Sequence, residues 1–163
     1  MLFRSYLPRN YSEDYKGWVS VRRALAGSLN IPAVRTLAML DVDEFVGTLR
    51  DVGLSSVIHE GGFYGYSLAL GSADVRLIEL TNAYRTLANG GMFSPVSFVP
   101  NAIKETDPAK KPIRALSAGS ASIVADILAD NNARAVSFGL DSRSEEHTSN
   151  SSHRNTSRMP SSA

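Results

Sequence analysis

Residues 18–34 contain signals for two helices that follow one another with only a short break between them. Ser20 is a favourable N-cap for the first helix, because its side-chain oxygen can accept a hydrogen bond from an early N–H group. Pro32 suits the first turn of the second helix, where its missing N–H group costs nothing. The break between them places Ser28 and Asn30 at the mouth of a helical hairpin.

Three further helices are predicted downstream. Asp41 and Glu44 form a D-x-x-E capping box before a helix that Gly53 ends. Residues 74–89 give the clearest helical pattern, with Glu79 and Asn82 expected on the surface or in capping positions. Its expected apolar stripe contains Leu77, Leu80, Ala83, Tyr84, Leu87 and Ala88. A last amphipathic helix is expected from Ser117 to about Leu128, with Ile123, Ile127 and Leu128 facing inward.

Strand signals are sparse. Residues 59–72 are rich in glycine and aromatic residues and are predicted to form a loop with irregular turns. Residues 93–103 alternate loosely and contain prolines, which suits an edge strand or an extended segment. Residues 106–112 are predicted to be a polar loop. The pattern therefore predicts a mostly helical body that is part of a domain.

The composition changes abruptly near the C-terminus. Residues 1–141 have the apolar content of a folded protein, whereas residues 142–163 have almost no apolar side chains. Such a segment cannot bury enough surface to offset the entropy of ordering. One interpretation is a disordered native tail. We favour another, that residues 142–163 are translated library-adapter sequence and not native.

Composition excludes several classes of function. The net charge is +1 with no block of like charges, which gives no basis for nucleic-acid binding. No apolar run of about 18 residues and no signal-peptide core occurs. Cysteine is absent, and His59 is separated from His147 and His153, so neither a metal site nor a cofactor is expected.

The Ser28-Leu29-Asn30 triplet is a weak pattern by itself, since chance alone supplies about one such match in a chain of this composition. In one interpretation, Ser28 and Asn30 end one helix and cap the next. In the other, the two polar side chains enter one cleft, where Ser28 can relay a proton and Asn30 can both donate and accept hydrogen bonds.

The flanking sequence is far more specific than the triplet. Residues 9–37, 64–91 and 121–142 resemble the transpeptidase domain of bifunctional, class A penicillin-binding proteins, and most of all the 1C subgroup. The resemblance runs in order through residues 8–142. It implies a mainly α fragment of the α+β fold shared by β-lactamases and penicillin-binding transpeptidases, with residues 1–141 forming part of that domain.

The resemblance also implies a chemistry. Enzymes of this family carry S-x-x-K, S-x-N and K-T-G motifs in that order. Their S-x-x-K serine attacks the D-alanyl-D-alanine end of a peptidoglycan stem peptide, and an amine of a second stem resolves the acyl-enzyme. β-Lactams acylate the same serine. By the match, Ser28 would shuttle a proton and Asn30 would hydrogen-bond the substrate amide and help to hold the catalytic lysine.

Further implied features concern the cleft and the parent protein. Tyr64, Tyr66 and Ser67 could line the substrate cleft, or they could pack around a glycine-rich turn. The parent protein is expected to be membrane-anchored, to act on the periplasmic side of the bacterial inner membrane and to carry a glycosyltransferase domain upstream. No cofactor and no nucleic acid is implied.

Two of the three motifs are missing from the sequence. No S-x-x-K and no K-T-G occurs among the 163 residues, so both ends are expected to be truncated and the fragment to be inactive alone. Two alternatives remain. One is a helical interaction module that has lost its chemistry. The other is a serine β-lactamase-type hydrolase, although class A β-lactamases carry Ser-Asp-Asn at this motif.

Overall fold

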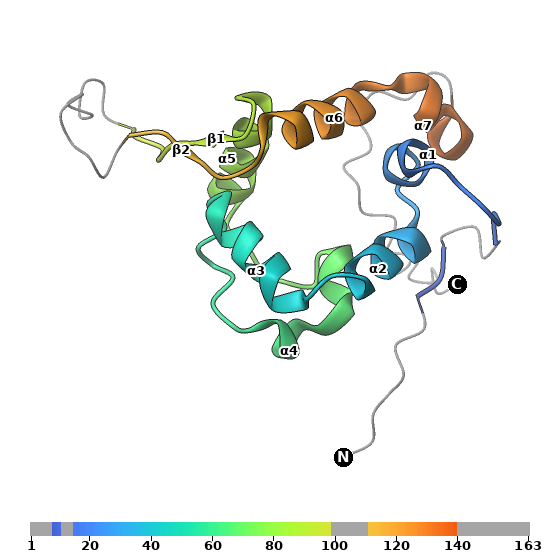
Figure 1. Ribbon diagram of the computed structural model, residues 1–163, viewed down its shortest axis with the longest axis horizontal. Coiled ribbons are helices and arrows are strands. Elements are labelled where there is room, and N and C mark those ends of the chain that lie inside the picture. The colour runs from blue at the N-terminus through green and yellow to red at the C-terminus, as the bar shows by residue number, and fades with distance from the viewer. Residues whose placement is uncertain (1–7, 11–14, 99–110, 140–163) are drawn as a thin grey trace, which may run out of the picture. The chain divides into compact units, whose positions relative to one another are not determined.

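The computed structural model describes residues 8–10, 15–98 and 111–139 (Figure 1). It divides into two units, residues 1–33 with 127–163 and residues 34–126. The unit boundaries fall within two helices, α2 (Asn30–Ala38) and α6 (Ala118–Ala129). The predicted tail, residues 142–163, lies outside the described residues.

The first unit is built on α1 (Val21–Ala26) and α7 (Asn131–Phe138), which contact one another. Ser20 caps α1 as predicted, accepting a hydrogen bond from the Arg23 N–H at 3.3 Å. Asp130 caps α7 through the Ala133 N–H at 3.0 Å and pairs with Arg22 of α1 at 2.9 Å. These two interactions lower the pKa of Asp130, the Ala133 hydrogen bond more strongly. The Asp130 carboxylate therefore both caps α7 and links α7 to α1 through an ion pair with Arg22.

The second unit contains most of the remaining elements. These are α3 (Val42–Asp51), α4 (Gly61–Tyr64), the 3₁₀ helix η1 (Gly65–Leu70), α5 (Leu77–Ala88), β1 (Met92–Phe93) and β2 (Ile113–Arg114). The two strands are antiparallel, with Met92 opposite Arg114. The predicted edge strand shortens to β1 among the described residues, and residues 99–110, with most of the predicted polar loop, lie outside them.

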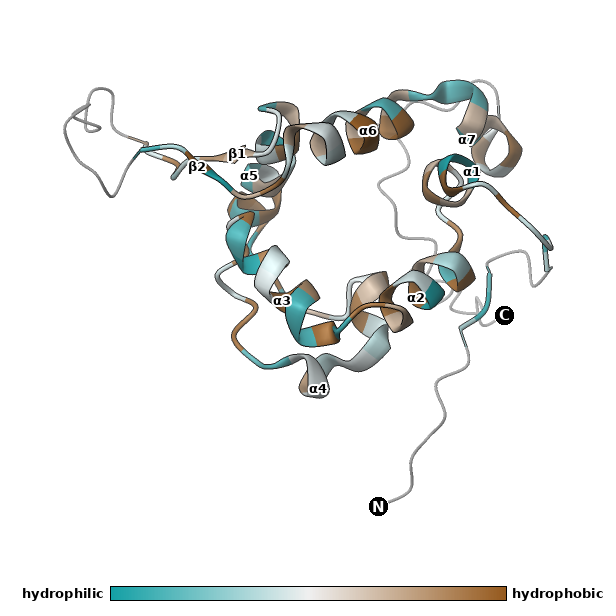
Figure 2. Ribbon diagram, in the orientation of Figure 1, coloured by the Kyte–Doolittle hydropathy of each residue, from teal (hydrophilic) through white to brown (hydrophobic). Residues whose placement is uncertain are grey.

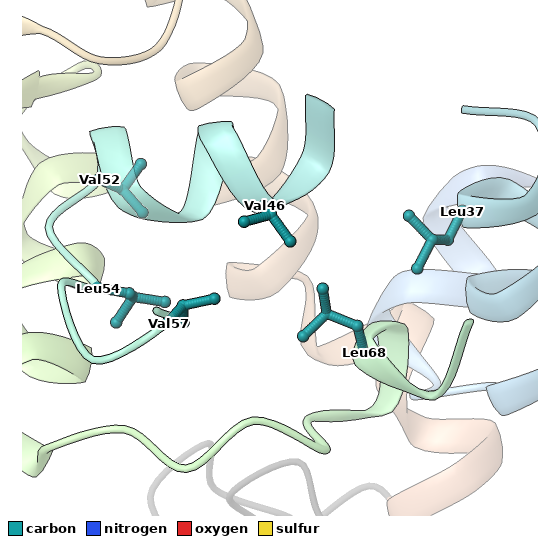
Figure 3. Close-up of a cluster of buried hydrophobic side chains, with 6 residues drawn as sticks. All are labelled: Leu37, Val46, Val52, Leu54, Val57 and Leu68. Carbon is teal, nitrogen blue, oxygen red and sulfur yellow. The ribbon is translucent and has the colours of Figure 1, made fainter. Parts of the chain in front are cut away.

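The core of the second unit lies among α3, the end of α2 and the segments that follow α3. Six buried side chains form it: Leu37, Val46, Val52, Leu54, Val57 and Leu68 (Figure 3). Figure 2 shows α3 alternating between hydrophilic and hydrophobic residues, as an amphipathic helix requires. Asp41 caps α3 through the N–H groups of Asp43 and Glu44, which confirms the predicted helix start.

Two predictions about local structure are wrong. Residues 59–72 form the short helices α4 and η1, because hydrogen bonds such as that from the Ser67 hydroxyl to the Tyr64 carbonyl, at 2.7 Å, satisfy the turns locally. In α6, Ile127 is buried as predicted, but Ile123 is 61% exposed.

The apolar stripe of α5 is also not the face that is buried. Leu77 is 80% exposed and Tyr84 is 52% exposed, whereas the buried side chains of the helix are Glu79, Asn82 and Thr86. Each of these three side chains makes at least one hydrogen bond, although the Asn82 Oδ1 is buried without a partner among the described residues. Glu79 binds Ser55 and Ser56, and the Asn82 amide donates to the Ser94 carbonyl at 3.2 Å. The expectation that Glu79 and Asn82 lie on the surface is therefore wrong.

Glu79 holds the turn between α3 and α4. It accepts hydrogen bonds from the Ser55 hydroxyl at 2.6 Å and the Ser56 N–H at 3.1 Å, and Arg76 lies 3.8 Å away. The Ser55 hydrogen bond, followed by that of Ser56, lowers the pKa of Glu79 from 4.5 to about 2. Because hydrogen bonds to the charged form lower a carboxyl pKa, the ionised Glu79 stabilises the folded unit.

We expect this stabilisation to depend on pH. It is fully present above the unfolded pKa of 4.5 and is lost as the pH falls through about 2. Glu79→Gln should remove this contribution to the fall in the free energy of unfolding at low pH. Urea unfolding at a series of pH values from pH 7 to pH 2 will measure it. Glu60→Gln is the matched control, since Glu60 is exposed and makes no side-chain cap at α4. Parallel pH profiles for wild type and Glu79→Gln would contradict the assignment.

Candidate functional site

Ser28 lies at the end of α1 in a left-handed backbone conformation. The Ser28 N–H donates to the Leu25 carbonyl at 3.1 Å, and the Leu29 N–H donates to the Ala24 carbonyl at 3.0 Å. This pair of bonds is the Schellman pattern, in which the residue after the C-cap adopts a positive φ and is usually glycine. Here φ is 51° at Ser28, which is the one positive φ found outside glycine among the described residues.

A serine at this position is strained relative to glycine. The left-handed conformation costs an L-residue about 1–2 kcal/mol because Cβ approaches the following carbonyl oxygen. Strain of this kind concentrates at functional sites. The Ser28 hydroxyl is half-buried and makes no hydrogen bond within the part of the chain that the structure describes.

Gly27 sets how closely α7 approaches this corner. A Cβ at Gly27 would lie 2.7 Å from the Arg23 carbonyl oxygen and 2.9 Å from the Ser137 Oγ of α7. Real Cβ atoms do not make contacts this short, so a side chain at Gly27 would displace α7 or the turn. The position of Ser28 thus depends on the absence of a side chain at the preceding residue.

Asn30 is the first residue of α2 and not its N-cap, so the interpretation in which Asn30 caps its own helix is wrong. The Asn30 Nδ2 donates to the Arg9 carbonyl at 2.9 Å, while the Ile31 N–H donates to the Asn10 Oδ1 at 3.2 Å. Asn10, which is 6% exposed, therefore supplies the cap to Ile31 from 21 positions earlier in the chain. No sequence pattern pointed to Asn10.

The second predicted group lies in the other unit, on α4 and η1. Tyr64 packs against the core, accepts from the His59 N–H at 3.4 Å and meets Phe63 edge to face, with ring centroids 5.1 Å apart. The Ser67 hydroxyl lies 2.7 Å from the Tyr64 carbonyl and 3.1 Å from the Ser72 hydroxyl. Tyr66 is 48% exposed. The contacts of Tyr64 and Ser67 are local packing, and a substrate role for the three residues stays a prediction.

The described residues bring together no cluster of three histidine, cysteine or acidic side chains that could hold a metal. No helix within the described ranges is long and apolar enough to cross a bilayer.

Residues 4–141 match the family described as the penicillin binding protein transpeptidase domain. The chain belongs to this family. The predicted fold class, a mainly helical part of that domain with little strand, is confirmed. The Ser28-Leu29-Asn30 corner lies within the matched residues, with the spacing of an S-x-N motif.

Individual relatives agree with the family match. The chain is 33% identical over 126 residues to Penicillin-binding protein 1C of Escherichia coli, an alignment that covers 77% of this chain and 16% of that protein. It is 38% identical over 96 residues to Penicillin-binding protein 2D of Bacillus subtilis, covering 58% and 13%. Penicillin-binding protein 1A of Aquifex aeolicus is 34% identical over 100 residues, covering 61% and 13%. The chain thus spans about a sixth or less of these relatives.

Proposed function

We propose that the chain is part of a peptidoglycan D,D-transpeptidase and supplies the S-x-N corner of its active site. The observation that carries the proposal is that Ser28 and Asn30 stand at a strained helix–helix corner inside a segment that matches the transpeptidase family. The substrates are stem peptides that end in D-alanyl-D-alanine, and β-lactams are mimics of that end.

Ser28 serves as a proton relay in this proposal. Acyl transfer needs a proton to leave the attacking serine and to reach the departing amine, and a positioned hydroxyl can pass it on. The half-buried Ser28 hydroxyl has no hydrogen-bond partner within the described ranges, which supports a role toward a group outside them.

Asn30 serves as the substrate clamp. Its amide has two N–H donors and a carbonyl oxygen, and one donor is already bound to the Arg9 carbonyl. The second N–H and the oxygen remain for a peptide amide of the substrate and for a lysine ammonium. Tyr64, Tyr66 and Ser67 are proposed to border the stem peptide.

The nucleophile and the K-T-G segment come from outside this sequence in our proposal, because neither S-x-x-K nor K-T-G occurs in it. The isolated chain is then inactive, since removing the nucleophile removes the covalent step. The parent protein is proposed to be anchored to the inner membrane and to act on its periplasmic side.

A segment exchange tests this proposal. In the exchanged protein, the part of E. coli Penicillin-binding protein 1C that aligns with this chain is replaced by the corresponding residues of the chain. We expect the exchanged protein to bind a fluorescent penicillin covalently and the isolated chain to remain unlabelled. An exchanged protein that is folded by circular dichroism but unlabelled would contradict the proposed function.

A further inference from the structure

The start of α2 has no capping residue of its own. Leu29 precedes the helix and has no side-chain oxygen, and Pro32 has no N–H group to satisfy. The early N–H of Ile31 instead donates to the Asn10 Oδ1 at 3.2 Å. An uncapped helix start leaves orphan donors, so this contact replaces a cap that the local sequence cannot provide.

The adjacent residue of the same segment holds the Asn30 side chain. The Asn30 Nδ2 donates to the Arg9 carbonyl at 2.9 Å. A carbonyl oxygen can only accept, so this contact fixes which end of the Asn30 amide faces Arg9. The neighbouring residues Arg9 and Asn10 therefore accept hydrogen bonds from the neighbouring residues Asn30 and Ile31.

We propose that Asn10 is a positioning residue for the S-x-N corner: its side chain fixes the start of α2, and with it the placement of the Asn30 amide that the Arg9 carbonyl orients. The proposal rests on the proposed function, in which the Asn30 amide meets the substrate. An amide held in one orientation before binding avoids the entropic cost of ordering, and an amide turned over would present an N–H where an oxygen is needed.

The burial of Asn10 supports this role. The residue is 6% exposed, and a buried amide must be hydrogen-bonded to be tolerated. Apolar residues would fill the same space without that requirement. A buried asparagine whose Oδ1 accepts from the Ile31 N–H at the start of α2 is consistent with a positioning role.

Nuclear magnetic resonance of the full chain tests the proposal through Ile31 and Asn30. Asn10→Ala removes the acceptor, so we expect the Ile31 amide to exchange with solvent about five- to tenfold faster. The two Asn30 side-chain amide protons should move toward the shifts of a free asparagine. The amides of α7 should keep their exchange rates, and Asn131→Ala on the exposed start of α7 should leave Ile31 and Asn30 unchanged.

Asn10→Asp is the conservative variant that restores the contact. Its carboxylate keeps an acceptor for the Ile31 N–H and places a negative charge at the start of α2, which the helix dipole favours. We expect wild-type exchange at Ile31 and an Ile31 amide proton shift that follows the ionisation of the introduced carboxyl between pH 2 and pH 6. A role in general stability alone would not produce that titration.

Two results would overturn the proposal. One is an Ile31 amide shift that does not respond to the introduced carboxyl of Asn10→Asp. The other is a uniform rise of exchange across α1, α2 and α7 in Asn10→Ala, which would make Asn10 a stability residue only. These readouts use no penicillin, so an unlabelled exchanged protein beside a titrating Ile31 would refute the proposed function and leave the positioning role intact.

Discussion

Ser28→Gly is expected to make the exchanged protein more stable and at the same time slower to react with penicillin. Glycine adopts the φ of 51° at this position without steric cost, but it also loses more backbone entropy on folding than serine does. The free energy of unfolding should therefore rise by a net amount of about 0.5–1 kcal/mol. The same change deletes the proposed proton relay, which should slow acylation about 100-fold or more. The two effects have opposite signs, which separates function from folding.

The measurement pairs urea unfolding with the second-order rate of labelling by a fluorescent penicillin. Ser28→Ala is the matched variant, because it removes the hydroxyl but keeps a Cβ in the left-handed conformation. Both variants should lose acylation to the same extent, and Ser28→Gly should be the more stable of the two. Unchanged acylation in Ser28→Gly would show that the hydroxyl carries no catalytic role.

Gly91→Ala should produce a large loss of stability in the second unit. Gly91 has a φ of 85°, its N–H donates to the Thr86 carbonyl, and its carbonyl accepts from Ala115 and Leu116. A Cβ at this position would lie 2.3 Å from the Leu116 carbonyl oxygen, a backbone atom that cannot move aside alone. Conformational strain and overpacking together predict a loss of about 2–5 kcal/mol.

Gly90→Ala is the matched control for this prediction. Gly90 has a φ of 62°, but a Cβ there would meet nothing within 4 Å. The Gly90→Ala substitution should therefore lower the free energy of unfolding only by the cost of the left-handed backbone, about 1–2 kcal/mol, as measured by urea unfolding. Equal losses in the two variants would contradict the close approach of Gly91 to Leu116.

The helix starts that rest on local capping were predictable from the sequence. Ser20 and Asp41 accept the hydrogen bonds expected of them, and α6 follows Ser117, whose hydroxyl accepts from the Ser120 N–H at 3.0 Å. Capping depends on residues within one turn of each other, so a local pattern contains the information.

The faces of the helices were less predictable, because they depend on which segment packs where. Apolar periodicity in α5 favoured Leu77 and Tyr84 as buried residues, yet Glu79 and Thr86 occupy the buried face. The deciding contact, from Ser55 to Glu79, joins residues 24 positions apart. The periodicity of a single segment cannot predict that a carboxylate is buried when its hydrogen-bond partners lie in a distant turn of the chain.

In the candidate site too, the local pattern was predictable from the sequence and the long-range contact was not. Ser28 and Asn30 were found because their spacing and flanking sequence match a known motif. Asn10 was missed because its contact with Ile31 spans 21 positions. No local signal indicated it, because Asn30 is itself a good N-cap residue ahead of Pro32, and the sequence alone does not show that this cap is absent.

The most direct test of the account is to map the penicilloyl adduct in the exchanged protein by peptide mass spectrometry. We expect one modified serine, which lies outside the residues contributed by this chain, and we expect Ser28 to be unmodified. An adduct on Ser28, or on any serine between residues 4 and 141 of the chain, would contradict the claim that the chain supplies the S-x-N corner and not the nucleophile.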